Sequence, residues 1–327
     1  MRRLAARLLI TGTALAVGAA AASCSDAAGL AYAQGATRPV AGTTTATATV
    51  PASARAKTTP VGTVITVVGA PKGVKAKAGI LMDVTTGQVL WAKGATATRP
   101  IASIAKVMTA LVILQAGGLN REVKVPKSVT AYVAKYDAEA AGLVPGQVFT
   151  VEELLKGMLI ESAADAAYTL ANAYGPGLPA FVAKMNAEAA HLGLVDTHFT
   201  SPDGLPYPTE TSTYSTPAEL VTLGQIAMSY PVFRSIVAMR FYNLPKGDGH
   251  GHYFFSTDDE LLLKYPGVIG IKTGFTNGAG HTLLFEAVRN GRTLIGDVLG
   301  SPDTGPSAGA NDAAKVLSWG FALSQSG

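Results

Sequence analysis

A serine and a lysine three positions apart form the first group of residues that could do chemistry. Ser103 and Lys106 open a run of apolar residues with helical spacing. Positions i and i+3 share one face of a helix, so the amine can approach the hydroxyl. A lysine held among apolar side chains loses hydration, which favours a neutral amine able to take the serine proton. Taken alone the motif is weak, because a serine cap beside a surface lysine has the same spacing.

A second group lies in a strand-like stretch near the C-terminus. Lys272, Thr273 and Gly274 follow one another. A cation beside a hydroxyl suits a substrate carboxylate, and the glycine lets a ligand come close to the backbone. By itself this motif is also compatible with an ordinary strand that carries a solvated lysine.

The third group is centred on Ser162, which follows a helix with a clear start signal. Ser162 lies 59 residues after Ser103 and 110 residues before Lys272. The ordered combination of three such groups is much more specific than any one of them.

The elements that must position these groups can be read from hydrophobic periodicity and turn signals. Strands are expected over 78–84, 88–92, 268–276, 281–288 and 292–299. Helices are expected over 103–115, 151–160, 165–173, 180–191, 217–228 and 311–323. Thr150 and Glu153 form a capping box before the second of these helices. Strands at both ends with helices between them predict an α+β domain whose sheet joins the two ends of the chain.

In combination, the three groups resemble the serine-type D-alanyl-D-alanine carboxypeptidases, a family of low-molecular-weight penicillin-binding proteins. The resemblance runs from about residue 76 to 325, with supporting stretches at 83–90, 100–110, 154–160, 201–205 and 265–267. It implies the penicillin-binding fold shared with serine β-lactamases, in which N- and C-terminal strands form an antiparallel sheet and a helical region lies between them.

The resemblance also implies roles for individual residues. Ser103 would be the acylated nucleophile and Lys106 its general base, while Ser162 would relay a proton to the leaving D-alanine. Lys272 and Thr273 would hold the terminal carboxylate of the substrate.

Two further residues of the C-terminal motif take part in the site that the resemblance implies. Gly274 belongs to the substrate-binding motif, and the backbone N–H groups of Phe275 and Ser103 would form the oxyanion hole. The expected partners are D-Ala-D-Ala-terminated peptidoglycan stem peptides and β-lactam antibiotics. No cofactor and no metal is implied.

One position departs from the family pattern. Where family members commonly have Asn two residues after the serine of the third group, this chain has Ala164. Loss of that amide removes about 1–3 kcal/mol of stabilisation if nothing substitutes for it. An active enzyme, acting by hydrolysis or by transpeptidation, is the first interpretation. A weakly active or non-catalytic envelope protein of the same fold remains the alternative.

A class A β-lactamase is the third interpretation and the least favoured. That class carries a Glu-x-x-Leu-Asn pattern between its second and third motifs, and this pattern is absent between Ser162 and Lys272.

Composition and charge exclude several other classes. The 327 residues are 48% hydrophobic with one cysteine, which rules out wholesale disorder, a disulfide scaffold and a cysteine-rich metal module. The net charge is +4, of which residues 1–33 contribute +2 through three arginines and one aspartate. No clustered basic surface for nucleic acid is expected. His250 and His252 lie with Asp248 in a glycine-rich stretch, which predicts a mobile loop. A metal site is not expected there, because no third or fourth ligand is evident.

The N-terminal residues predict export. Residues 1–33 have a cationic start and a short apolar run, as in a signal peptide. The signal ends either after Ala33 or at Cys24, which would then be acylated and would provide the only expected attachment to a membrane. Residues 34–62 form an Ala/Thr/Pro-rich linker and residues 63–327 the catalytic domain. We therefore expect an extracytoplasmic protein, secreted or lipid-anchored.

Overall fold

The computed structural model describes residues 69–323. The expected export signal (1–33), the linker (34–62), Cys24 and the expected start of the domain at residue 63 lie outside these described residues.

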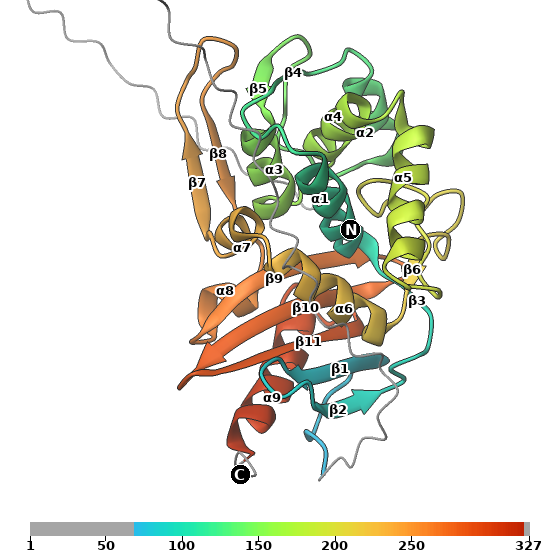
Figure 1. The fold of residues 1–327 in the computed structure, drawn as a ribbon, viewed down its shortest axis with the longest axis vertical. Coiled ribbons are helices and arrows are strands. Elements are labelled where there is room, and N and C mark those ends of the chain that lie inside the picture. The colour runs from blue at the N-terminus through green and yellow to red at the C-terminus, as the bar shows by residue number, and fades with distance from the viewer. Residues whose placement is uncertain (1–68, 324–327) are drawn as a thin grey trace, which may run out of the picture. The chain divides into compact units, whose positions relative to one another are not determined.

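A five-stranded antiparallel sheet joins the two ends of the domain (Figure 1). Its order is β2 (Val89–Lys93), β1 (Ala78–Asp83), β11 (Arg292–Ser301), β10 (Gly280–Arg289) and β9 (Val268–Thr276). The C-terminal helix α9 (Ala308–Ala322) packs on one face of this sheet and α6 (Pro217–Met228) on the other. The predicted α+β class and the joining of N- and C-terminal strands are confirmed.

The helical region lies on the α6 side of the sheet (Figure 1). Its elements are η1 (Ala102–Ile104), α1 (Ala105–Ala116), α2 (Val129–Tyr136), α3 (Val151–Ile160), α4 (Ala164–Tyr174), α5 (Leu178–His191) and α7 (Pro231–Val237). The short helix α8 (Glu260–Lys264) lies on the other face and packs beside α9. Every residue of α1 from Ala105 to Ile113 is buried, so this part of the helix has apolar neighbours on all sides. In that setting any polar side chain on α1 must find a partner inside the protein.

The capping box begins α3 where the sequence predicts it. The Thr150 hydroxyl accepts from the Glu153 backbone N–H at 3.2 Å, and the Glu153 carboxylate accepts from the Thr150 N–H at 2.7 Å. The expected helix from residue 103 differs at its start, because residues 102–104 form a 3₁₀ turn before α1. Ser103 therefore lies in a tighter turn than the sequence predicts.

Three short sheets and three helices were not predicted. The strand pairs are β3 (Arg99–Pro100) with β6 (Tyr214–Ser215), β4 (Glu122–Lys124) with β5 (Val148–Thr150), and β7 (Phe241–Leu244) with β8 (Tyr253–Ser256). The unpredicted helices are α2, α7 and α8. These strands have two to four residues and α8 has five, which is too short for a clear period.

The glycine-rich loop 247–252 joins β7 to β8 and packs against the protein. The Gly249 carbonyl accepts from the Val148 N–H at 2.9 Å, and the His250 ring stacks on Phe149 at 4.5 Å. The expected mobile loop is thus docked on β5 through a backbone bond and an aromatic contact. Within residues 69–323, no group of three or more His, Cys, Asp or Glu side chains is arranged to hold a metal ion.

No single helix among residues 69–323 is long and apolar enough to cross a membrane; α6 and α7 meet the length and composition test only as a bent pair.

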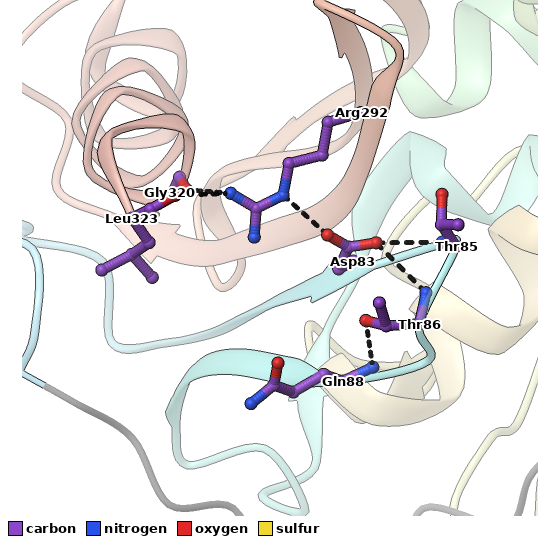
Figure 2. Close-up of polar contacts among 7 residues, drawn as sticks. All are labelled: Asp83, Thr85, Thr86, Gln88, Arg292, Gly320 and Leu323. Atoms are coloured by element: carbon purple, nitrogen blue, oxygen red, sulfur yellow. Dashed lines mark hydrogen bonds and ion pairs between the residues drawn. The ribbon is translucent and has the colours of Figure 1, made fainter. Parts of the chain in front are cut away.

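A buried ion pair connects the first hairpin to the C-terminal helix (Figure 2). Arg292 donates from Nε to Asp83 Oδ2 at 2.6 Å and from a terminal nitrogen to the carbonyls of Gly320 and Leu323 at 2.9 and 3.0 Å. The other Asp83 oxygen accepts from two backbone N–H groups of the β1–β2 turn. The guanidinium also caps the end of α9. Loss of either Asp83 or Arg292 would leave the other as an unpaired charge in a buried site, which is strongly destabilising.

A second buried acid, Asp297, has no such partner. It lies in the centre of β11 between Ile80 of β1 and Leu284 of β10, and its residue is fully buried. Neither carboxylate oxygen has a hydrogen-bond partner among the described residues. Burial raises the pKa of Asp297 well above its ordinary value.

We expect Asp297→Asn to remove a pH-dependent loss of stability. The unfolded chain releases the Asp297 proton near pH 4, whereas the folded chain keeps it, so the free energy of unfolding falls as the pH rises towards the folded pKa. The slope is about 1.4 kcal/mol per pH unit, and a neutral amide of the same shape has none. In urea unfolding at pH 4, 5.5 and 7, the free energy of unfolding of the variant relative to that of the native protein should increase at each step. Parallel stability curves would contradict this account.

Candidate active site

Lys106 lies at the centre of the predicted site. Its Nζ is 2.8 Å from Ser103 Oγ, 3.5 Å from Ser162 Oγ and 3.0 Å from the Asp203 carbonyl oxygen. Lys106 is 2% exposed, on the buried helix α1. The structure therefore brings together the three residues that the sequence assigned to proton transfer, and it adds a backbone carbonyl as a fourth group.

Burial changes the acid–base behaviour of this lysine. Loss of hydration is the main cause that lowers the pKa of Lys106 to about 8, and the positive charge of Lys272 acts in the same direction. The negative charge of Asp203 opposes the shift. A lysine with this pKa is partly neutral near pH 8, and the neutral amine can accept a proton from a hydroxyl 2.8 Å away.

The turn that carries Ser103 is strained and tightly packed. Ala102, which has a φ of 48°, lies in the left-handed region that L-residues with side chains seldom adopt. Gly204, at φ 82°, presses against it: a Cβ at position 204 would lie 1.8 Å from the Ala102 carbonyl oxygen. Only glycine fits there. This close approach brings the Asp203 carbonyl onto Lys106.

Ser162 lies in an equally unusual conformation between α3 and α4. Its φ is 59° and it is 4% exposed. The start of α4 is held by Asp165, which is buried and accepts from the N–H groups of Ala141, Leu143 and Ala166 at 3.2, 2.8 and 2.8 Å. These bonds clamp the segment before residue 143 onto α4 and fix the turn that presents Ser162.

Ala164 is the first residue of α4 and is buried at 2% exposure. Its N–H donates to the Glu139 carbonyl at 2.8 Å, so Glu139 runs alongside the position where the family has an amide. Burial raises the pKa of the Glu139 carboxyl, and the charge of Asp258 adds to this, whereas Lys272 and Lys106 lower it. Glu139 is therefore electrostatically coupled to the lysines of the site, which the sequence did not indicate.

The sequence did not predict the buried residues that hold the Asp203 carbonyl next to Lys106. Asp203 is 1% exposed, and its carboxylate accepts from the Tyr132 hydroxyl at 2.8 Å. The Tyr207 hydroxyl lies 3.4 Å from that of Tyr132, and burial raises the pKa of Tyr207 to about 12. Asp203 lies in the 201–205 stretch that supports the family resemblance, but no sequence signal assigned it a role, and neither tyrosine has a local pattern that points to the site.

Strand β9 borders the same site. Gly274 lies against the Ser103 turn, since a Cβ at position 274 would be 2.9 Å from the Ser103 nitrogen and 2.7 Å from Thr282 Oγ1. The Thr282 hydroxyl is 3.3 Å from the Ile101 carbonyl and 3.1 Å from that of Gly274, which ties the turn to the sheet. The 44% exposed side chain of Phe275 packs its ring 4.6 Å from that of His281.

The two residues expected to bind a carboxylate lie side by side on β9. Lys272 is 2% exposed, and its Nζ donates to Thr273 Oγ1 at 3.1 Å. The Thr273 hydroxyl in turn donates to Asp258 Oδ1 at 2.8 Å. The site thus combines a serine hydroxyl and a lysine amine in hydrogen-bond contact, a second serine hydroxyl, and a cation on β9, which is an arrangement suited to acyl transfer to a serine.

Comparisons with known proteins agree with this geometry. The sequence pattern of the family described as D-alanyl-D-alanine carboxypeptidase matches residues 65–303. A D-alanyl-D-alanine carboxypeptidase of Streptomyces is 37% identical over 262 residues, which cover 76% of this chain and 88% of that protein. One from Mycobacterium tuberculosis is 41% identical over 251 residues, covering 76% of this chain and 83% of the relative.

Solved structures give the same assignment. A DD-transpeptidase of Streptomyces superposes with a TM-score of 0.72 at 36% identity and covers 78% of this chain and 100% of its own. The D-alanyl-D-alanine carboxypeptidase of Mycobacterium tuberculosis has a TM-score of 0.72 at 38% identity, covering 81% and 98%. The penicillin-binding fold expected from the sequence is confirmed, and the chain belongs to the D-alanyl-D-alanine carboxypeptidase family.

Proposed function

We propose that this protein is a serine D,D-peptidase that acts on D-Ala-D-Ala-terminated peptidoglycan stem peptides through an acyl-enzyme on Ser103. The single observation that carries the proposal is the buried Lys106 amine 2.8 Å from Ser103 Oγ, with its pKa lowered to about 8. Penicillins, which carry a reactive amide and a carboxylate, would acylate the same serine.

In the proposed acylation, Lys106 takes the Ser103 proton while Oγ attacks the carbonyl carbon of the penultimate D-alanine. The oxyanion that forms is stabilised by the backbone N–H groups of Ser103 and Phe275. Collapse of this intermediate breaks the peptide bond, and the leaving amine of D-alanine receives a proton from Lys106 through Ser162. Water then releases the acyl group in a carboxypeptidase, or an acceptor amine does so in a transpeptidase.

Substrate orientation in this proposal depends on β9. Lys272 and Thr273 hold the terminal carboxylate, and Gly274 allows the peptide backbone to approach the strand. This assignment is supported by the burial of Lys272 and by the tight packing of Gly274 on the Ser103 turn.

The second candidate is a non-catalytic or weakly active protein of the same fold. Ala164 favours it, because the amide that family members commonly place there is missing and Ala164 N–H is already bonded to Glu139. A protein of this kind would bind peptidoglycan peptides without turnover.

Export is also part of the proposal. Membership of a family that acts on the cell wall supports an extracytoplasmic location. Residues 1–33 as a signal peptide, 34–62 as a linker and 63–327 as the catalytic domain follow from the sequence. The intact mass of the mature N-terminus distinguishes cleavage after Ala33 from acylation at Cys24.

Labelling with a fluorescent penicillin tests the proposed nucleophile and base. The native protein should form a covalent adduct, and both Ser103→Ala and Lys106→Ala should abolish it. The Lys106→Ala change should leave the free energy of unfolding within about 2 kcal/mol, since only one side chain loses its packing. Absence of labelling in the native protein would favour the non-catalytic candidate, and labelling of Ser103→Ala would place the nucleophile elsewhere.

The pH dependence of acylation tests the state of Lys106. Because the base acts in its deprotonated form, the rate constant for penicillin acylation should rise between pH 6.5 and 9 with a midpoint near the Lys106 pKa of about 8. Lys272→Gln should move the midpoint to higher pH, since the Lys272 charge lowers the Lys106 pKa. Lys246→Gln, an exposed lysine in the β7–β8 loop, is the matched control and should leave the midpoint in place. A rate that is flat or falls over this range would rule out a lysine base.

Ala164→Asn tests the effect of the missing amide. A side chain that can hydrogen-bond both the substrate amide and Lys106 should raise acylation by a D-Ala-D-Ala peptide about tenfold, corresponding to about 1.4 kcal/mol. Acylation rate constants of the two proteins, with their thermal midpoints as a folding control, provide the measurement. A lower rate in a stable variant would show instead that the site has repacked around alanine.

A further inference from the structure

Asp258 makes a direct contact with the expected carboxylate-binding pair. Its Oδ1 accepts the Thr273 hydroxyl proton at 2.8 Å, while Thr273 Oγ1 accepts from the Lys272 ammonium at 3.1 Å. Asp258 is exposed and belongs to the segment between β8 and α8. Neither the sequence motifs nor the proposed chemistry uses this residue.

The hydrogen bonds that the Thr273 hydroxyl already makes limit what it can offer a ligand. A threonine hydroxyl has one proton and two lone pairs. Here the proton goes to Asp258 and one lone pair to Lys272, so Thr273 presents only a lone pair to any further ligand. A carboxylate has lone pairs alone, and it can bond to Thr273 only if the hydroxyl leaves Asp258.

The fold holds Asp258 in this place. Its neighbour Asp259 is buried and caps α8, with Oδ1 accepting from the N–H groups of Leu261 and Leu262 at 2.9 and 3.2 Å. The Asp259 N–H donates to Thr257 Oγ1 at 3.1 Å, and the Thr257 N–H donates to the Arg240 carbonyl beside β7. Residues on both sides of Asp258 are therefore fixed, and its carboxylate stays at the edge of β9.

Charge adds to the competition. The negative charge of Asp258 acts on Glu139 and on Lys106, so it extends across the site. A substrate carboxylate that reaches Lys272 must approach this charge, and part of the attraction of the lysine is cancelled. Because Asp258 is exposed, solvent and salt screen the effect and keep it moderate.

We propose that Asp258 is a specificity-determining residue that competes with the substrate carboxylate for the Thr273 hydroxyl. It lowers the affinity of the site for ligands that end in a free carboxylate, and it acts through Thr273. This inference rests on the proposed function, since it takes Lys272 and Thr273 as the carboxylate-binding pair.

The test compares ligands that differ only in that charge. Asp258→Asn keeps the size of the side chain, removes its charge and leaves only a weaker, neutral acceptor for the Thr273 hydroxyl, so the rate constant for acylation by benzylpenicillin should rise about three- to tenfold. Acylation by the methyl ester of the same penicillin should change less than twofold. Asp248→Asn removes an equal charge from the exposed β7–β8 loop and should leave both rates unchanged. A lower benzylpenicillin rate in Asp258→Asn, or an equal gain with the ester, would overturn the inference.

A second comparison isolates the hydroxyl. In a Thr273→Val background, Asp258→Asn should give a clearly smaller gain, because the contested hydrogen bond is already gone and only the screened charge effect on Lys272 remains. A gain of undiminished size there would show that Asp258 acts by charge alone and would reject the competition for Thr273.

Direct binding separates this inference from the proposed function. Affinity for a D-Ala-D-Ala peptide can be measured by calorimetry in the Ser103→Ala protein with and without Asp258→Asn. A several-fold higher affinity for the peptide in the double variant supports the inference. If the native protein then shows no turnover, the catalytic proposal fails while the inference about Asp258 stands. Equal affinities would overturn the inference whatever the activity.

Discussion

The burial of one amine, that of Lys106, is the constraint on which the site depends. An isolated ammonium inside a protein is strongly unfavourable, and the group responds by losing its proton or by gaining polar partners. Lys106 does both: its pKa falls to about 8, and two hydroxyls and one carbonyl surround it. Those partners come from three segments, the Ser103 turn, the α3–α4 connection and the 201–205 loop. The apolar packing of α1 thus determines both where the lysine lies and how basic it is.

The partners of Lys106 are held at some conformational cost. Ala102 and Ser162 both have positive φ, a conformation that disfavours each by about 1–2 kcal/mol. Such strain persists only where the surroundings fix it. Thr282 ties the Ser103 turn to β9, and the buried Asp165 anchors the segment around Ser162. The sheet and α4 therefore supply the rigidity that keeps hydroxyls and amine within hydrogen-bond distance.

Local signals account for what the sequence could predict. Strand β9, helix α3 and helix α6 have the predicted bounds, because periodicity, a capping box and a helix-starting proline are encoded within a few neighbouring residues. The grouping of Ser103, Lys106 and Ser162 was also predicted, though from the order of three motifs and not from any one of them. Asp203 and Asp258 were missed since each acts through a contact with a residue distant in sequence. Asp203 lies 97 residues from Lys106, and no local pattern records such a pair.

The residues proposed for proton transfer and those proposed for substrate binding come from different parts of this molecule. In the proposed proton-transfer group, Lys106 and Ser162 are buried, and the Lys106 amine lies within hydrogen-bond distance of both serine hydroxyls. Two features characterise the groups that would hold the substrate: alanine at position 164, and a carboxylate hydrogen-bonded to Thr273. Weaker binding of ground state and transition state alike raises KM without a matching loss in kcat. If only substrate binding is weakened, the protein remains a competent acyl-transfer enzyme at the high local concentration of peptides in a polymer. If the missing amide also orients Lys106 in the transition state, kcat falls as well. The change in kcat relative to the change in KM therefore shows whether position 164 serves proton transfer or substrate binding.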